Sequence, residues 1–410
     1  MERVLDRCAG LDVHKKTVTA CVRVPDTSGG RTQHVRTFAT TTAELLTLRD
    51  WLEAHRVSHV AMESTGVYWR PVFYGLEEAC TCILANAGQI AQVPGRKSDV
   101  NDAVWIAQLL EHGLIRPSFV PPAPIRELRD LTRYRKLLIQ ARTRHANRLH
   151  KVLEDAGIKL TSVAPRLLGA SGRARLDALV AGTTDPAVLA NLARGTLRKK
   201  LPALQQALTG RFRAPPACLV SQVLAHLDYL DEAVATVSAQ IDTAMAPFHE
   251  ELARLDTIHG VNKRTAEVLI AELGADMTVF PTATHAASWA GLCPGNHESA
   301  GKHRSGRTRH GHRWLRTALI EAALAASVRS TTGAFAARYR RIMPHRGHKK
   351  AVVAVAHAML VTAYHLLARQ TTYQDPGSDY NDRRQAERAR RRAIQTLERQ
   401  GFRVALEPAA

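Results

Sequence analysis

Four carboxylates in the first quarter of the chain stand where acids could carry chemistry. Asp12 lies inside the apolar segment GLDVHKK, and Glu63 ends the apolar segment HVAME. Asp99 and Asp102 follow Ser98, a residue type that commonly caps helices, so both would fall on one face of a first helical turn. Carboxylates that converge repel each other unless divalent cations with oxygen ligands, normally Mg²⁺ or Mn²⁺, bind between them.

Such a cluster predicts phosphodiester chemistry, because two divalent cations about 3.5 to 4 Å apart can activate an attacking hydroxyl and stabilise the leaving oxygen. Each acid also has an ordinary structural interpretation. Asp99 can stabilise a helix start, Glu63 can cap a turn, and Asp12 can pair with a neighbouring lysine. The interpretation as a nuclease or strand-transfer site depends on all four acids meeting.

A second segment with chemical potential is CPGNHESAGKHRSGRTRHGHRWLR, residues 293–316. It has no acid after Glu298, and its glycines allow the backbone to approach a phosphate chain closely. Ser299 and Ser305 are candidate nucleophiles, although a serine in a basic loop more often contacts a phosphate. The cations of this segment are Lys302, Arg304, Arg307, Arg309, Arg313 and Arg316.

The overall charge agrees with a polyanionic partner. The 410 residues include 57 Lys and Arg against 37 Asp and Glu, for a formal net charge of +20 and a pI near 10.2. The length predicts two or three domains. Six cysteines are too few for a disulfide framework, and we expect neither a membrane span nor a signal peptide, which favours a cytoplasmic protein.

Apolar periodicity predicts an N-terminal α/β unit. Residues 7–39 alternate as a three-stranded meander, followed by a helix over 43–55 that Thr41 or Thr42 can cap, a strand ending at Glu63, a helix over 68–79, a strand over 80–85 and a helix over 98–112. The order β, β, β, α, β, α, β, α is that of the ribonuclease H fold.

The remainder of the chain is predicted to be helical. Four prolines in residues 116–124 mark a boundary, and from Ile125 a long helix carries many cations on one face. Residues 219–245 have the spacing of a coiled-coil seam. Residues 255–274 resemble a helix-hairpin-helix element, in which we expect Asn262 to tolerate positive φ in place of a second glycine.

Several of these segments together resemble the DEDD-type transposases of the insertion-sequence 110 family. The resemblance runs from about residue 7 to 400 through GLDVHKKT, MESTGVYWRPVFYGLE, VPGRKSDVNDA, LRDLTRYRKLL, RTAEVLIAELG and SWAGLCPGNHESAGKHRSGRTRHGHRWLRTAL. It departs from the family at residues 86–92, where a basic or histidine residue is common before VPGRK.

The resemblance implies the roles of particular residues and partners. Asp12, Glu63, Asp99 and Asp102 would be the metal ligands for Mg²⁺ or Mn²⁺, and Ser299 would attack DNA and form a phosphoserine link. The resemblance further implies an RNA-guided recombinase, in which a guide (bridge) RNA from the element pairs with donor and target DNA. The active site would join the acids of one subunit with the serine of another, in a dimer or tetramer.

The resulting fold class is α/β plus α. We expect a ribonuclease-H-like domain, similar to Holliday-junction resolvases, over 1–116 and a helical coiled-coil connector over 117–250. A mostly helical C-terminal transposase domain over 251–375 would contain the serine and the helix-hairpin-helix-like element. A basic tail would follow over 376–410. The expected nucleic-acid contacts are Arg96, Lys97, Arg133, Arg135, Lys136, Lys302, Arg304, Arg307, Arg309 and Arg313.

Two other classes of function remain open from the sequence. A metal-dependent, structure-specific nuclease of the Holliday-junction resolvase type would use the same acids but would not need Ser299 or the residues beyond about 250. A non-catalytic nucleic-acid-binding protein would explain the charge but not the four acids.

Overall fold

The structure is a computed structural model that describes residues 3–26, 29–64, 66–90, 102–295, 297–299, 302–308, 310–330 and 332–405. At 89, 297–299, 302–305, 381, 382, 384 and 385 it describes the backbone alone. The chain divides into two compact units, Met1–Pro121 and Pro122–Ala410.

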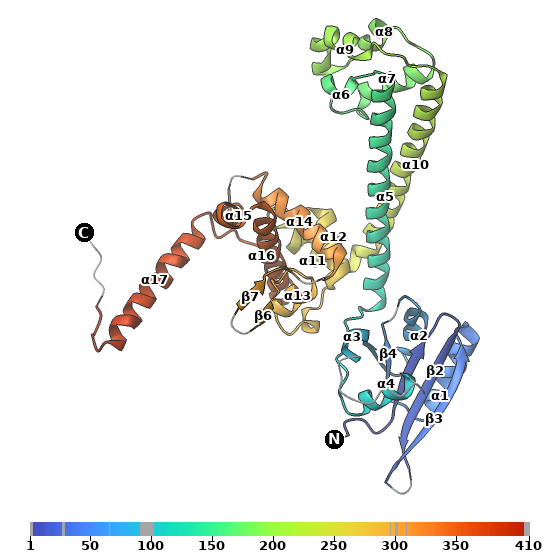
Figure 1. Ribbon diagram of the computed structural model, residues 1–410, viewed down its shortest axis with the longest axis vertical. Helices are drawn as coiled ribbons and strands as arrows, with labels where there is room; N and C mark the ends of the chain where they lie inside the picture. Colours follow the sequence, from blue (N-terminus) through green and yellow to red (C-terminus); the bar gives the residue numbers. More distant parts are fainter. Residues whose placement is uncertain are drawn as a thin grey trace. The chain divides into compact units, whose positions relative to one another are not determined.

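The first unit is built on a five-stranded mixed sheet with the order β3-β2-β1-β4-β5 (Figure 1). Strands β1 to β3 pair antiparallel, while β1, β4 and β5 run parallel. The described elements follow the order expected from the sequence, with the short α3 in addition. Their bounds are β1 Cys8–Val13, β2 Thr17–Pro25, β3 Arg31–Ala39, α1 Thr42–Ala54, β4 His59–Glu63, α2 Trp69–Leu76, β5 Thr81–Ala85, α3 Ala87–Ile90 and α4 Asp102–Glu111.

Side-chain alternation along β1 assigns the two faces of this sheet. Ala9, Leu11 and Val13 join the apolar core that also contains residues of α1 and α2. Cys8 points to the other face, where it packs with Ile106 of α4. Helices therefore cover both faces of the sheet, and Gly10 and Asp12 share the α4 side with Cys8.

The second unit begins with two long helices, α5 and α10, which lie side by side and are joined at one end by a small helical cap (Figure 1). On α10 the buried or half-buried residues Val220, Val223, Leu227, Leu230, Val234, Val237 and Ile241 recur at steps of three and four. The cap has its own apolar core with the ends of both helices. The bounds are α5 Ala123–Asp155, α6 Leu160–Val163, α7 Ala170–Val180, α8 Pro186–Asn191, η1 Gly195–Lys200, α9 Leu201–Leu208 and α10 Ala214–Met245.

A helical bundle with a small hairpin follows. Its elements are η2 Ala246–Phe248, α11 His249–Asp256, α12 Lys263–Leu273, η3 Met277–Val279, α13 Ala283–Trp289, β6 His297–Ser299, β7 Lys302–Ser305, α14 Arg313–Ser327, α15 Ala334–Arg346, α16 His348–Arg369 and α17 Tyr380–Arg399. Among the described residues, α16 alone is long and apolar enough to cross a membrane by length and composition, with a mean hydropathy of 1.8. Half of that apolar window is buried against the rest of the bundle, so its composition is that of a core helix.

The turn between α11 and α12 differs from the expectation at Asn262. Gly260 has the positive φ, +87°, and a Cβ there would lie 2.6 Å from the carbonyl oxygen of Ala322 on α14. Asn262 is extended (φ −113°) and caps α12, because its Oδ1 accepts hydrogen bonds from the backbone N–H and the Oγ1 of Thr265. The expectation of positive φ at Asn262 was wrong, because Gly260 provides the positive φ of this turn and Asn262 is extended.

Candidate active site and nucleic-acid interface

Two of the predicted acids are aligned by the register of neighbouring parallel strands. Leu11 of β1 lies opposite Met62 of β4, so Asp12 and Glu63 are the next residues of the two strands in line. Parallel strands in register point aligned side chains to the same face. Asp12 is half-buried, with 28% of its side chain exposed.

The third acid, Asp102, is brought to the same face by the packing of α4 on Gly10. A Cβ at Gly10 would lie 2.2 Å from the carbonyl oxygen of Ala103 and 2.3 Å from the backbone nitrogen of Ala107. Only glycine permits this approach of helix and strand. Because Asp102 is the first residue of α4, the contact places it beside the β1 position two residues beyond Gly10.

The pKa of Asp12 reflects both its burial and the charges of the other two acids. Burial raises the pKa of Asp12, and the negative charges of Asp102 and Glu63 raise it further. His14 opposes the increase, since its Nε2 lies 3.1 Å from the Asp12 Oδ2. The carboxylates thus form a site of mutual repulsion, which a cation would relieve.

The donor set suits a hard divalent cation, because it consists of carboxylate oxygens. Among the described side chains, however, no group of three His, Cys, Asp or Glu residues has the spacing of a metal site. Asp99, the fourth predicted acid, and the cations Arg96 and Lys97 lie outside the described residues. The fit to Mg²⁺ therefore rests on the carboxylate oxygens of the three described acids.

Ser299 is the last residue of β6 in the two-stranded hairpin of the second unit. The register pairs Ser299 with Lys302, next to the turn, and Ser305 with His297, at the base. The Gly295 N–H donates a 3.0 Å hydrogen bond to the Arg307 carbonyl just below this base. The two serines therefore stand at opposite ends of one short hairpin.

The predicted cations of this segment are described only in part. Arg307 and Arg313 are exposed. The side chains of Lys302 and Arg304 and the whole of Arg309 lie outside the described residues. Arg313 begins α14, and its neighbour His312 caps that helix by accepting a hydrogen bond from the Leu315 N–H.

His312, in the same basic segment, has a structural role in the bundle. Its ring stacks on Trp289 with centroids 4.7 Å apart, and its Nε2 lies 3.3 Å from the Glu272 Oε2. Burial lowers the pKa of His312 to about 4 despite the opposing charge of Glu272. A neutral imidazole packed in this way is a fixed part of the bundle.

The three α5 cations predicted to contact nucleic acid all have partners within the chain. Arg133 forms a two-pronged ion pair with Glu272 of α12, and the Lys136 Nζ lies 2.7 Å from the Glu321 Oε1 on α14. Arg135 is 4% exposed and pairs with Glu267 at 2.5 Å.

For Arg135 the prediction of a nucleic-acid contact needs correction, because a buried side chain that is already paired has no access to an external phosphate. The sequence signal for this pairing was the presence of two glutamates, Glu267 and Glu272, within the otherwise apolar residues 266–273. Arg129 also pairs with Glu272, at 3.2 Å. These ion pairs attach the first half of α5 to α12.

We expect Glu267→Ala to lower the free energy of unfolding by about 3 to 5 kcal/mol, because it leaves the Arg135 charge buried without a partner. The double variant Arg135→Met/Glu267→Leu should recover most of this loss. Lys136→Met, which removes a more exposed pair, should cost about 1 kcal/mol or less. Urea unfolding of the three variants measures the difference, and equal losses in all three would contradict a buried pair at Arg135.

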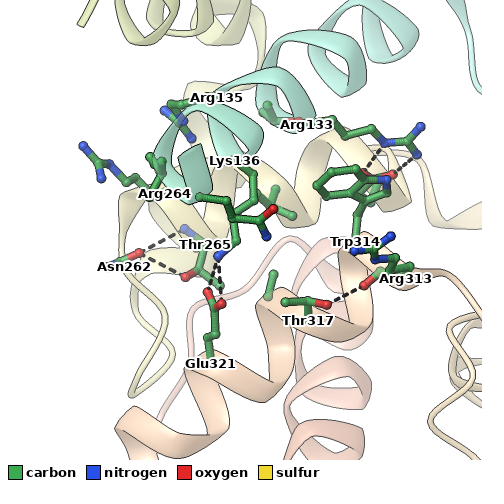
Figure 2. A pocket seen from close by; sticks show the side chains of 16 residues that line it. Arg133, Arg135, Lys136, Asn262, Arg264, Thr265, Arg313, Trp314, Thr317 and Glu321 are labelled. Carbon is green, nitrogen blue, oxygen red and sulfur yellow. Dashed lines mark hydrogen bonds and ion pairs between the residues drawn. The ribbon is translucent and has the colours of Figure 1, made fainter. Parts of the chain in front are cut away.

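A cavity of about 370 Å³ opens between α5, α12 and α14 (Figure 2). We call it the α5–α12–α14 pocket. Its lining includes Arg133, the buried Arg135 and Lys136 of α5. Two exposed cations join them: Arg264, which the sequence did not single out, and Arg313. Trp314 contributes an aromatic wall, with the guanidinium of Arg313 5.9 Å from its ring centroid. Cations beside a half-buried aromatic ring at a pocket wall suit a nucleic-acid strand.

The first unit thus has carboxylates at the carboxyl ends of β1 and β4, and the second unit has a basic hairpin and a cationic pocket. These features are typical of the class of enzymes that act on DNA. A family model described as "Transposase", for DEDD transposases of the IS110 type, matches residues 9–158, and one described as "Transposase IS116/IS110/IS902 family" matches residues 252–340. The chain belongs to the IS110 family of insertion-sequence transposases.

Two curated relatives are similar to this chain. The transposase for insertion sequence element IS1111A of Coxiella burnetii is 26% identical over 326 residues, which cover 78% of this chain and 80% of the relative. The insertion element IS110 uncharacterized 43.6 kDa protein of Streptomyces coelicolor is 36% identical over 108 residues, 26% of each chain.

Proposed function

We propose that this transposase is a recombinase that cuts and exchanges DNA strands under the guidance of an RNA encoded by its own insertion sequence. The observation that supports this most directly is the convergence of Asp12, Glu63 and Asp102 on the α4 face of the sheet. Asp99 would complete the set. We assign these four acids to the binding of Mg²⁺ or Mn²⁺, which when bound would stabilise the charge that develops at the phosphodiester.

Ser299 is the proposed nucleophile. It is the last residue of β6 and pairs in register with Lys302, the first residue of β7. A serine hydroxyl is a weak nucleophile, so its attack on phosphorus requires a proton acceptor and nearby positive charge. Lys302, Arg304, Arg307 and Arg309 are proposed to supply that charge.

The domain assignment is part of the proposal. The strand order β3-β2-β1-β4-β5 supports a ribonuclease-H-like domain over 1–116. The long helices support a coiled-coil connector over 117–250, with the transposase domain over 251–375 and a basic tail over 376–410. We further propose that the acids of one subunit act with Ser299 of another, in a dimer or tetramer that acts on the bacterial nucleoid in the cytoplasm.

The α5–α12–α14 pocket is the proposed nucleic-acid interface of the second unit. Arg264 and Arg313 are exposed there without a described carboxylate partner in ion-pair contact, whereas Arg133 and Lys136 are shared with glutamates. Arg96 and Lys97 are proposed contacts of the first unit. Arg135 lines the pocket but is buried in its ion pair with Glu267, so it is not a proposed contact.

The test of the proposal is the RNA that the protein retains. We expect the protein, purified from cells that carry the whole insertion sequence, to retain an RNA whose sequence maps to the element's non-coding end. The variant Arg264→Gln/Arg313→Gln should release it at lower salt and reduce the slope of log K against log salt by about 1.4, since each single-strand phosphate contact contributes about 0.7.

Lys199→Gln/Lys200→Gln is the matched control, because it removes the same charge from exposed lysines of the cap. Its salt slope should stay close to that of the wild type. Retention of no element RNA, with DNA strands still exchanged, would remove RNA guidance from the proposal. Equal slopes for the two double variants would place the interface elsewhere.

A further inference from the structure

A second cavity, of about 890 Å³, lies in the bundle between α15, α16 and the segment that follows α16. We call it the α15–α16 pocket. Its volume falls within the roughly 300–1,000 Å³ that is typical of ligand sites. Its charged lining is cationic, with Arg338 of α15, Arg369 of α16, and two histidines, His357 and His365, and no carboxylate belongs to the described lining.

Arg338 is the unusual residue of this pocket. Its Nε is shielded from solvent and has no hydrogen-bond partner, and among the described residues no carboxylate lies within ion-pair distance of the side chain. Burial and the nearby charge of Arg341 lower the pKa of Arg338, and burial together with Arg338 lowers that of His357. A half-buried cation with one shielded, unpaired N–H and no described counter-charge is well suited to bind an anion that enters the pocket.

The acid nearest in sequence to the pocket already has partners. Asp375 accepts a hydrogen bond from the Ala334 N–H at 3.1 Å and from the Gly377 N–H at 2.9 Å, and its Oδ2 lies 3.0 Å from the His259 Nδ1. Its carboxylate thus caps the start of α15 rather than neutralising Arg338. The cationic lining stays available for a ligand.

One wall of the pocket is aromatic. Tyr373 stacks on Phe335 with centroids 5.6 Å apart and planes at 14°, and Tyr380 at the start of α17 is 38% exposed. The Tyr373 N–H donates to the Thr257 Oγ1 at 2.9 Å, which fixes the segment that carries this wall. Flat aromatic surfaces beside unpaired arginines are the combination that binds a base and its phosphate.

We propose that the α15–α16 pocket binds one unstacked nucleotide of a single-stranded nucleic acid, with the phosphate at Arg338 and Arg369 and the base against Tyr373 and Tyr380. The inference rests on the proposed function in that the ligand belongs to the nucleic-acid substrates or guide of the transposase. It adds a site distinct from the acids, the hairpin and the α5–α12–α14 pocket.

The experiment measures binding of a short labelled single-stranded DNA, the RNA of the same sequence and a duplex to the full-length protein. Arg338→Met should weaken single-strand binding at least tenfold and leave duplex binding within about twofold. Arg346→Met, which removes an exposed charge from the end of the same helix, is the matched control and should change single-strand binding less than threefold.

Thermal unfolding separates a ligand site from a structural role. Because Arg338→Met removes a half-buried charge whose Nε–H has no partner, its Tm should equal or exceed that of the wild type, whereas loss of a structural arginine would lower it. A 2-aminopurine base in the single strand should be quenched on binding, and Tyr380→Ala should reduce the quenching.

Several results would overturn the proposed nucleotide site. A lower Tm for Arg338→Met, or equal effects of Arg338→Met and Arg346→Met on binding, would overturn the pocket. Competition by adenosine monophosphate or inorganic phosphate at micromolar concentration would overturn it as a nucleic-acid site and assign it to a free anion. The two proposals can fail separately. If the wild type exchanges no DNA strands, the proposed function is wrong. If in the same experiments Arg338→Met, but not Arg346→Met, loses single-strand binding, the proposed nucleotide site is still supported.

Discussion

Asp12→Asn should abolish strand cleavage and exchange, with a loss of about a thousandfold or more, while the protein stays folded. Asp12 is aligned with Glu63 and close to Asp102, so an amide in its place removes one charge from the centre of the acid cluster. The geometry of β1 should be unchanged, because Asn has the size of Asp. Cleavage of labelled donor DNA in Mg²⁺ measures the effect.

The environment of Asp12 can also be tested by measuring protein stability, which does not require an activity assay. Since the pKa of Asp12 is raised on folding, the folded state binds its proton more tightly than the unfolded chain. The wild type should therefore gain stability as the pH falls through the raised pKa toward the lower pKa of the unfolded chain, and lose that gain as the pH rises back through the raised pKa. Asp12→Asn lacks this dependence and should have an equal or higher Tm at neutral pH in EDTA.

Addition of Mg²⁺ or Mn²⁺ should raise the Tm of the wild type but not that of Asp12→Asn, because a ligand that binds only the folded state stabilises it. Asp50→Asn is the control, since it removes an exposed carboxylate from α1, which packs on the opposite face of the sheet from α4, and it should behave as the wild type. Normal strand exchange by Asp12→Asn in Mg²⁺ would show that the metal site is assigned to the wrong residues.

Ser299→Ala should bind nucleic acid normally and form no covalent protein–DNA adduct. In the proposed step the Ser299 Oγ loses its proton and forms a bond to phosphorus, and the bond from phosphorus to one DNA oxygen breaks. That leaving oxygen takes up a proton, and the DNA phosphate stays attached to the serine. Denaturing gel electrophoresis of a reaction with labelled DNA detects the adduct.

Ser305→Ala is the matched control because Ser305 lies in the same hairpin, at its base rather than at its turn. This variant should keep at least part of the adduct yield. An adduct that persists in Ser299→Ala would remove this serine from the mechanism. Cleavage without any adduct, in the wild type as in the variant, would favour the metal-dependent nuclease that uses water.

Local patterns in the sequence were sufficient for the elements that position the acids. Alternation of apolar residues identified β1 and β4, and the parallel pairing of these strands follows from the helix between them. Gly10 was not selected, because nothing in a linear pattern indicates that a helix about 90 residues later will pack onto its Cα. The proximity of Asp102 to Asp12 depends on that contact.

The charged face of α5 shows where sequence reasoning fails. Arg133, Arg135 and Lys136 have the spacing of a nucleic-acid-binding face, but the side chains opposite them come from α12 and α14, more than 130 residues away in the chain. Charge alone does not distinguish a cation that meets a phosphate from one that meets a buried glutamate. For Arg135, tertiary packing decided between the two.

The pairing of α5 with α10 limits how this protein can vary in length. The 33 residues of α5 span roughly 50 Å at 1.5 Å per residue, and pairs such as Arg142 with Asp231 and His145 with His226 fix the register of the two helices. Loss of one residue from α5 would turn everything beyond it by about 100° and break that register. Insertions and deletions in evolution should therefore occur in both helices together, in steps of seven residues, so that the distance from bundle to cap changes by increments of about 10 Å.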